Sequence, residues 1–186
     1  MRTFIATVAA CFVIVTGCRK PGEAARAAQE HDTAETKGRH VDIESDDGST
    51  SHIRAAENGL TFSGKDKDGS TGSMTFGAGA KVPDGFPIAV ISGLEVMTSS
   101  SSSDPQGQKT QLVMATGRKR HADVVTFYEA ELKKLGLQNV QRSDASSSGD
   151  QTTLLLSDDG RGRSASLQIS TLADGQSTVT LSVSGF

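Results

Sequence analysis

The chain has 186 residues, a formal net charge of −3 and a hydrophobic content of 35%, below the usual ~45–50%, a range that also counts glycine. This balance excludes the strongly basic character expected of a nucleic-acid-binding domain. With 20 glycines, one Tyr and no Trp, the composition indicates short strands, many turns and a thin core rather than a large enzyme cleft.

The N-terminal residues have the features of an export signal. Arg2 supplies one positive charge, and a nearly unbroken apolar run covers residues 4–15. The run is too short for a transmembrane helix, which needs about 20 apolar residues. A charged start, an apolar stretch and small residues after it are typical of a secretory signal peptide, which we expect over residues 1–17.

The signal ends in Val15-Thr16-Gly17-Cys18, which resembles the lipobox of bacterial lipoproteins. The resemblance implies cleavage between Gly17 and Cys18 and a diacylglyceryl group on the Cys18 thiol. Each buried methylene of chains such as palmitate contributes about 0.8 kcal/mol, so two or more chains hold stably in a membrane. The alternative is an ordinary secretory signal that happens to contain a cysteine.

Arg19 follows that cysteine. In enteric-type Gram-negative bacteria, aspartate at this position retains lipoproteins in the inner membrane. For a Gram-negative source, the resemblance therefore implies an outer-membrane lipoprotein that faces the periplasm.

Residues 18–40 predict a flexible tether. The stretch is polar on all sides and lacks an apolar stripe, so it is not expected to form a stable helix. Its 22 residues after Cys18 could reach on the order of 75 Å when extended.

Residues 41–80 predict a small β module. Turn signals at Asp47-Gly48, Asn58-Gly59 and Asp68-Gly69 recur about every ten residues, and Asn-Gly and Asp-Gly are strong hairpin signals. The short apolar runs between them fit either a meander of hairpins or the rungs of a small β-solenoid. Two prolines and a glycine at 83–87 mark a module boundary.

Residues 81–186 predict an α+β domain, in which an antiparallel sheet packs against one main helix at about 120–135. The helix carries an apolar face with 3.6-residue periodicity, made of His121, Val124, Val125, Tyr128, Leu132 and Leu135. Strands are expected from Leu94 into the serine tract 99–103, then at 109–116, 137–142, 152–157, 164–171 and 178–184. The last two alternate cleanly between apolar and polar residues, as a sheet with one buried face requires.

A second resemblance covers residues 82–137. The stretch contains Val82-Pro83-Asp84-Gly85-Phe86-Pro87, a strand beginning at Gly93-Leu94-Glu95-Val96, and Phe127-Tyr128 followed by Leu132 and Gly136. These motifs are similar to a recurrent α+β domain of bacterial envelope lipoproteins. Gly85 and Leu137 depart from that domain's pattern, at positions where an aspartate and an aromatic residue are usual. The resemblance implies an envelope lipoprotein and supplies no catalytic mechanism.

The sequence predicts no catalytic residue, metal or cofactor. His31, His40, His52 and His121 are scattered, and none pairs with another at ligand spacing. The acids of Asp66-Lys67-Asp68-Gly69 and of 42–46 lack the remaining ligands of a calcium loop, and we interpret them as turn residues. His121 is expected to be a partly buried imidazole on the helix face.

Arg118, Lys119 and Arg120 form a basic cluster before the predicted helix, where the dipole end is already positive. They could bind an anionic head group, a glycan phosphate or an acidic partner; the alternative is a solvated loop. We therefore expect a non-enzymatic envelope lipoprotein, held to the membrane through Cys18, that binds an envelope protein or glycan but no nucleic acid. An anion- or glycan-binding module using Arg118–Arg120 and an unrecognised envelope hydrolase are the alternatives.

Overall fold

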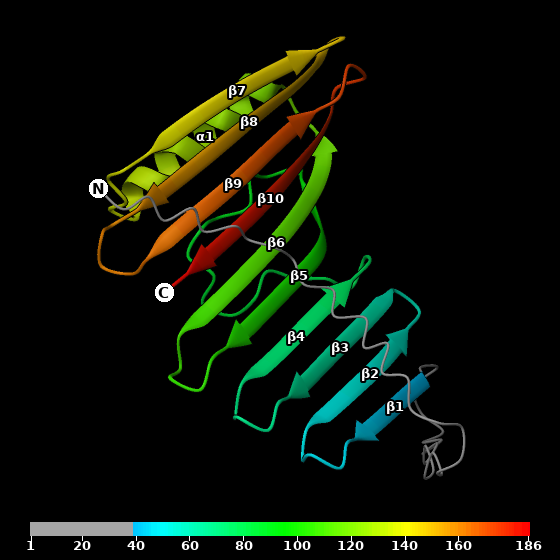
Figure 1. Ribbon diagram of the computed structural model, residues 1–186. Coiled ribbons are helices and arrows are strands. Elements are labelled where there is room, and N and C mark those ends of the chain that lie inside the picture. The colour runs from blue at the N-terminus through cyan, green and yellow to red at the C-terminus, as the bar shows by residue number, and fades with distance from the viewer. Residues whose placement is uncertain (1–38) are drawn as a thin grey trace.

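The computed structural model describes residues 39–186, which form one ten-stranded antiparallel sheet with a single helix (Figure 1). The strand order is β1-β2-β3-β4-β5-β6-β10-β9-β8-β7. The predicted signal peptide, Cys18 and the tether up to residue 38 lie outside the described residues.

The elements in chain order have these bounds: β1 (Arg39–Glu44), β2 (Thr50–Ala56), β3 (Gly59–Lys65), β4 (Thr71–Phe76), β5 (Glu95–Ser103), β6 (Lys109–Arg118), α1 (His121–Lys134), β7 (Gln141–Ser147), β8 (Asp150–Asp158), β9 (Ser164–Thr171) and β10 (Gln176–Ser184). The part of the chain that the structure describes contains no helix with the length and apolar character needed to cross a bilayer.

The Asp-Gly turns act as the sequence indicates. Gly48 and Gly69 have φ values of 84° and 94°, a region that glycine enters without steric cost. Just before each glycine an aspartate accepts a backbone N–H two residues ahead: Asp47 from Ser49 at 3.1 Å and Asp68 from Ser70 at 2.8 Å. These turns join β1 to β2 and β3 to β4 as antiparallel neighbours.

The expected fold class, an α+β domain preceded by a separate small β module, is wrong. Strand β4 pairs with β5 over six residue pairs, from Thr71↔Ser103 to Phe76↔Thr98, so the early hairpins and the later strands share one sheet. The serine tract makes this possible because its backbone bonds to β4 on one side and β6 on the other. Residues 39–186 are mostly sheet, with one helix of 14 residues. The proposed domain limits 41–80 and 81–186 stay predictions.

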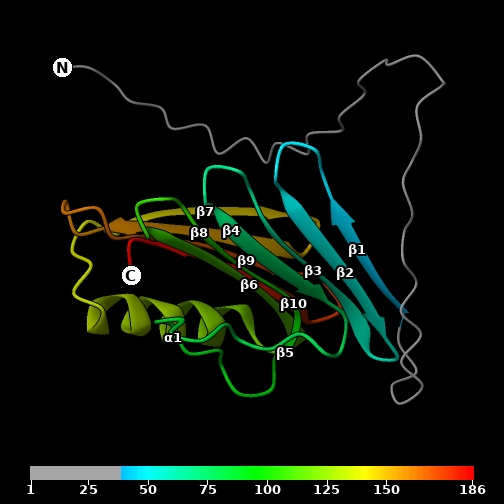
Figure 2. The same cartoon turned by 90° about the horizontal axis from the view of Figure 1, so that it is seen from below.

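Helix α1 covers only part of one sheet face and packs on β8 and β9 (Figure 2). Val124, Val125, Tyr128 and Leu132 are buried, as the periodicity predicts, and Glu131 is buried with them. Asp123 in the first turn and Lys133 and Lys134 in the last turn match the helix dipole.

The segment 77–94 lies beside the helix on the same side of the sheet (Figure 2). Ile88 is 1% exposed and belongs to the core cluster. The Tyr128 hydroxyl and the Glu131 carboxylate accept backbone N–H groups of this segment, from Ile91 at 3.4 Å and Ala89 at 3.3 Å. Burial raises the pKa of Tyr128 to about 12, so the hydroxyl stays protonated.

The apolar face of the sheet changes sides between its two halves. In β6 and β8–β10 the apolar residues face α1 and are buried; they include Val113, Leu155, Leu167, Ile169, Val179 and Leu181. In β1–β4 the register places the apolar residues on the opposite face; they include Val41, Ile53, Phe62 and Met74, which are lateral neighbours in one row. None of residues 39–79 is buried.

Candidate functional site

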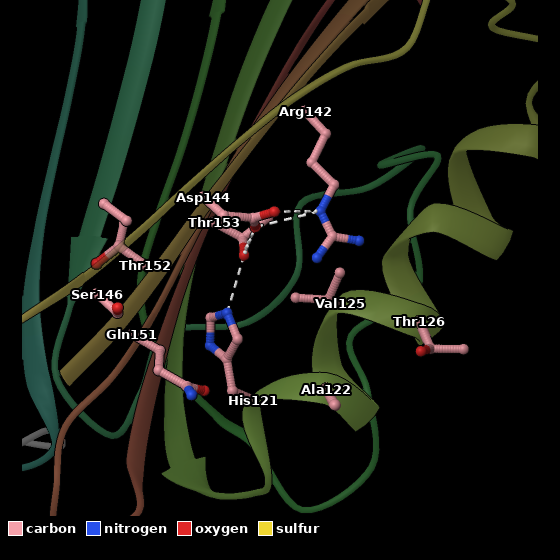
Figure 3. A pocket seen from close by; sticks show the side chains of 11 residues that line it. His121, Ala122, Val125, Thr126, Arg142, Asp144, Ser146, Gln151, Thr152 and Thr153 are labelled. Atoms are coloured by element: carbon pink, nitrogen blue, oxygen red, sulfur yellow. Dashed lines mark hydrogen bonds and ion pairs between the residues drawn. The ribbon is translucent and has the colours of Figure 1, made fainter. Parts of the chain in front are cut away.

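A pocket of about 450 Å³ lies between the first turn of α1 and strands β7 and β8 (Figure 3). The helix contributes His121, Ala122 and Val125 to its lining, and the strands contribute polar side chains that include Arg142, Asp144, Ser146, Gln151 and Thr153. The volume lies within the ~300–1,000 Å³ range of small-molecule sites.

Local structure places these side chains in the pocket. His121 begins the helix on the same face as the buried Val124 and Val125. In the β7–β8 register Arg142 lies opposite Leu155, and Asp144 lies opposite Thr153. Since paired residues share a face of the sheet, both charged side chains of β7 lie on the helix side.

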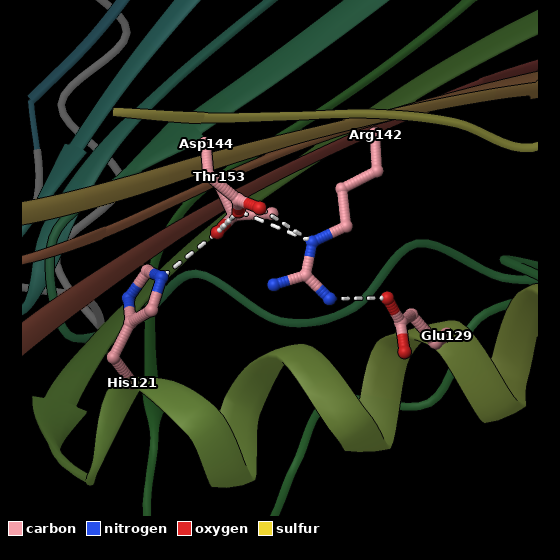
Figure 4. Close-up of polar contacts among 5 residues, drawn as sticks. All are labelled: His121, Glu129, Arg142, Asp144 and Thr153. Carbon is pink, nitrogen blue, oxygen red and sulfur yellow. Dashed lines mark hydrogen bonds and ion pairs between the residues drawn. The ribbon is translucent and has the colours of Figure 1, made fainter. Parts of the chain in front are cut away.

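A hydrogen-bonded chain links the helix to the edge strand (Figure 4). His121 Nε2 lies 2.8 Å from Thr153 Oγ1, and this hydroxyl donates to Asp144 Oδ1 at 2.6 Å. Arg142 Nε donates to Asp144 Oδ2 at 2.8 Å, and its Nη1 donates to Glu129 Oε1 at 2.8 Å. The Arg142 guanidinium is therefore held between two carboxylates.

The other imidazole nitrogen leads into the core. His121 Nδ1 lies 3.0 Å from Thr171 Oγ1, which lies 2.8 Å from Ser177 Oγ. Ser177 in turn donates to the carbonyl of Lys119 at 2.9 Å. The pocket is thus connected to the loop that precedes α1.

The protonation of His121 decides how many of these contacts are hydrogen bonds. This series of hydrogen-bonding groups ends in an acceptor on each side, the Asp144 carboxylate and the Lys119 carbonyl. Its five contacts share three hydroxyl hydrogens and the imidazole N–H groups. A neutral imidazole has one N–H and an imidazolium has two, so the neutral form leaves one contact without a hydrogen.

Burial lowers the pKa of His121; the nearby Asp144 raises it and Arg142 lowers it further. Burial weighs most, so we assign the neutral form at pH 7. The hydrogen bond from Thr153 and the one from Arg142 lower the pKa of Asp144, which keeps that carboxylate ionised. Among the charged residues that line the pocket, Arg142 and Asp144 therefore balance each other.

The order of groups differs from that of a hydrolytic triad. In a triad the hydroxyl donates to the imidazole, whose second nitrogen donates to the carboxylate. Here the Thr153 hydroxyl stands between His121 and Asp144, its hydrogen is directed to the carboxylate, and Thr153 is 0% exposed. This arrangement orients the side chains and does not activate a nucleophile.

The basic cluster predicted from sequence lies at the end of β6 and before α1. Arg120 is the N-cap residue, makes no side-chain cap bond and donates two hydrogen bonds to Asp123, at 2.8 and 2.7 Å. One of the three charges is therefore already paired. Anion binding by Arg118, Lys119 and Arg120 stays a prediction. The candidate calcium acids Asp66 and Asp68 accept backbone N–H groups within their turn.

Sequence reasoning found His121 but not its partners Arg142, Asp144 and Thr153. Strand β7 reads Gln-Arg-Ser-Asp-Ala-Ser-Ser and is exposed throughout, so it lacks the apolar alternation that marks a strand. The signal that could have found the site is the pair of opposite charges at Arg142 and Asp144, two residues apart as neighbours on one face of a strand.

A family model described as START domain-like matches residues 94–184. The match spans β5 to β10, with α1 and the whole pocket. Neither a curated protein nor a solved structure matches the chain significantly.

Proposed function

We propose that the protein is a membrane-anchored, non-catalytic binding protein, and that the pocket between α1 and β7–β8 holds its ligand. The observation that carries the proposal is the position of this pocket inside the START domain-like region, between helix α1 and the sheet. START-like domains are typically ligand-binding rather than catalytic.

The pocket chemistry favours a small, uncharged, amphipathic ligand. Ala122 and Val125 give it an apolar side, while Gln151, Ser146 and the Arg142–Asp144 pair give it hydrogen-bonding groups. An anion would meet the Asp144 carboxylate and a cation would meet the Arg142 guanidinium, whereas a neutral ligand can use the free hydrogen-bonding positions of both side chains. About 450 Å³ limits the ligand to a compact molecule.

The neutral state of His121 supports the same ligand class. An imidazolium beside Arg142 would attract anions, but the lowered pKa of His121 removes that charge near pH 7. The hydrolase alternative is not favoured, because the hydroxyl, imidazole and carboxylate stand in the wrong order for nucleophilic attack.

The anchor remains part of the proposal on the strength of the lipobox resemblance at Val15-Thr16-Gly17-Cys18. Acylation of Cys18 would hold the binding domain at the bacterial envelope, on the periplasmic side of the outer membrane in a Gram-negative cell. An envelope protein or glycan near that surface could supply or receive the ligand.

Ligand binding can be tested by filling the pocket. Ala122→Trp places an indole in the first turn of α1, where Ala122 lines the pocket. Ala130→Trp adds the same group to an exposed position of the same helix that does not line it. Ligand-observed NMR against a library of neutral amphipathic fragments should detect binding to the wild type and to Ala130→Trp but not to Ala122→Trp. Equal binding by both variants would contradict the proposed site.

The anchor is tested separately. Globomycin, which blocks lipoprotein signal peptidase, should cause the uncut precursor to accumulate, and Cys18→Ala should leave the chain unprocessed or release it from the membrane. Normal cleavage together with membrane retention of Cys18→Ala would contradict the anchor, without bearing on the pocket.

A further inference from the structure

Three side chains that commonly bind metals meet on the two outermost strands at the β1 edge. The register pairs Asp42 of β1 with His52 of β2, and His40 precedes Asp42 by two residues. Residues two apart on a strand share a face, so all three lie on one face of the sheet. They are remote in sequence from the residues that line the pocket at α1.

Their ligand atoms converge on one point. His40 Nε2 lies 2.8 Å from Asp42 Oδ1, and His52 Nδ1 contacts the same oxygen. One such atom from each residue lies within 4.8 Å of the other two. The imidazole rings are stacked with an interplanar angle of 4° and centroids 6.2 Å apart, so the two rings lie nearly parallel, and His40 faces the carboxylate with Nε2 while His52 faces it with Nδ1.

We propose that His40, Asp42 and His52 bind one divalent transition-metal ion, with Zn²⁺ or Cu²⁺ as the best fit. Two imidazole nitrogens and one carboxylate oxygen form a donor set suited to these ions. Ca²⁺ and Mg²⁺ fit poorly because they require mostly oxygen ligands. Three protein ligands leave at least one coordination position open to water or an external ligand.

The surroundings permit the change of proton position that metal binding requires. The ion needs the Nε2 lone pair of His40, so the ring must carry its hydrogen on Nδ1 instead. His40 Nδ1 has no hydrogen-bond partner among the described residues, so placing the hydrogen there breaks no bond at that atom. The Nε2 contact with Asp42 would be replaced by bonds from both atoms to the ion. Arg54 lies opposite His40 in the register, and its positive charge limits the affinity for a cation.

The ion would join the edge strand to its neighbour. Among the described residues, strand β1 is hydrogen-bonded only to β2, and the three ligands come from these two strands alone. A metal that binds the folded pair but not the separated strands stabilises the pair by mass action. The proposed ion would therefore reduce fraying of β1.

Isothermal titration calorimetry with ZnCl₂ tests the site on the detergent-solubilised full chain carrying Cys11→Ser and Cys18→Ser, which removes competing thiols. One Zn²⁺ should bind per chain. His40→Ala, His52→Ala and Asp42→Asn should each weaken binding about tenfold or more, since even outer-shell changes cost 10–100-fold. Glu44→Gln is the matched control, because it removes an exposed acid of the same strand that is not in the cluster.

Electron paramagnetic resonance of the Cu²⁺ form gives a readout that does not depend on the folding of variants. The wild type should show coupling to two imidazole nitrogens. Absence of saturable Zn²⁺ binding, equal weakening by Asp42→Asn and Glu44→Gln, or a Cu²⁺ spectrum without nitrogen coupling would overturn the site.

Discussion

The two halves of the sheet use the same backbone pairing but differ in what covers them. In β6 and β8–β10 the apolar face lies under α1 and the segment 77–94, and residues such as Val113, Leu167 and Leu181 are 0% exposed. In β1–β4 the apolar face lies on the other side, where Ile43 is 48% and Phe62 is 38% exposed. Continuous hydrogen bonding therefore does not imply a continuous core.

Strand β5 explains how one sheet can reverse its apolar face. Ser99 and Ser101 share the helix-side face with Val113 and Gln111 of β6, while Ser100 and Ser102 share the opposite face with residues of β4. Small polar side chains on both faces suit a strand between two oppositely oriented apolar faces. The serine tract, which looks like low complexity in the sequence, is the boundary between the halves.

The largest expected effect is on stability. Leu181→Ala should lower the free energy of unfolding by about 2–5 kcal/mol, because it opens a cavity in a fully buried site. Phe62→Ala, in the exposed half, should cost about 1 kcal/mol or less even though it removes a larger side chain. Urea denaturation followed by circular dichroism measures both. A larger loss for Phe62→Ala would contradict the location of the core.

The next effect concerns the network at the pocket. Thr153→Val keeps the shape but removes the hydroxyl between His121 and Asp144, so both lose a partner. We expect a loss of about 1–3 kcal/mol in the free energy of unfolding, because a buried polar group is left unsatisfied. Thr180→Val is the matched control, because Thr180 lies on the face of β10 that points away from α1, and it should change stability little. Equal effects would show that the network does not stabilise the helix on the sheet.

A smaller effect is expected on the pH dependence of stability. Because the pKa of folded His121 is lowered from its ordinary value of 6.5, the unfolded chain binds a proton there before the folded chain does. The contribution of His121 to stability is therefore present above pH 6.5 and falls as the pH drops below it. NMR titration should give a pKa below 6.5 for His121. Between pH 7 and pH 5 the wild type should lose more unfolding free energy than His121→Asn does. A measured pKa above 6.5 for His121 would contradict the assignment of burial as the main cause of the shift.

The smallest effect on stability, but a clear effect on binding of an apolar dye, is expected at the exposed face of β1–β4. This face contains a hollow of about 620 Å³ lined by Ile43, Ile53, Phe62 and Met74 among others. Phe62→Ser should lower the fluorescence of anilinonaphthalene sulfonate bound to the native protein. Leu156→Ser removes a similarly exposed apolar side chain that does not line this hollow and should leave the fluorescence nearly unchanged. The same decrease in both would mean that the exposed apolar face is not a distinct surface.

Local patterns in the sequence located most elements. Alternation placed a strand at 164–171, the bounds of β9, and helical periodicity placed α1 within a residue at each end. The strand expected at 137–142 was misplaced, because Leu137 suggested a strand but instead packs into the core at 3% exposure. Strand β7 begins at Gln141 and has no apolar alternation by which to find it.

The features that could not be predicted from the sequence depend on pairing between strands. The contact of Asp144 with Thr153 and the meeting of His40 with His52 depend on strand register, which local patterns do not encode. The reversal of the apolar face is likewise invisible in single strands, since strands of both halves, such as β3 and β9, alternate normally when read alone. It follows only when the strands are placed side by side, and this is why a separate β module was expected where the structure has one sheet.

Native-state hydrogen exchange tests the central claim most directly, which is that one sheet contains a core-bearing half and a half without a core. Amides of β6, β9 and β10 should exchange only on global unfolding, whereas amides of β1–β4 should exchange through local opening at a clearly lower free energy, since protection follows buried apolar contacts. Equal opening free energies across β1–β4 and β6–β10 would contradict it.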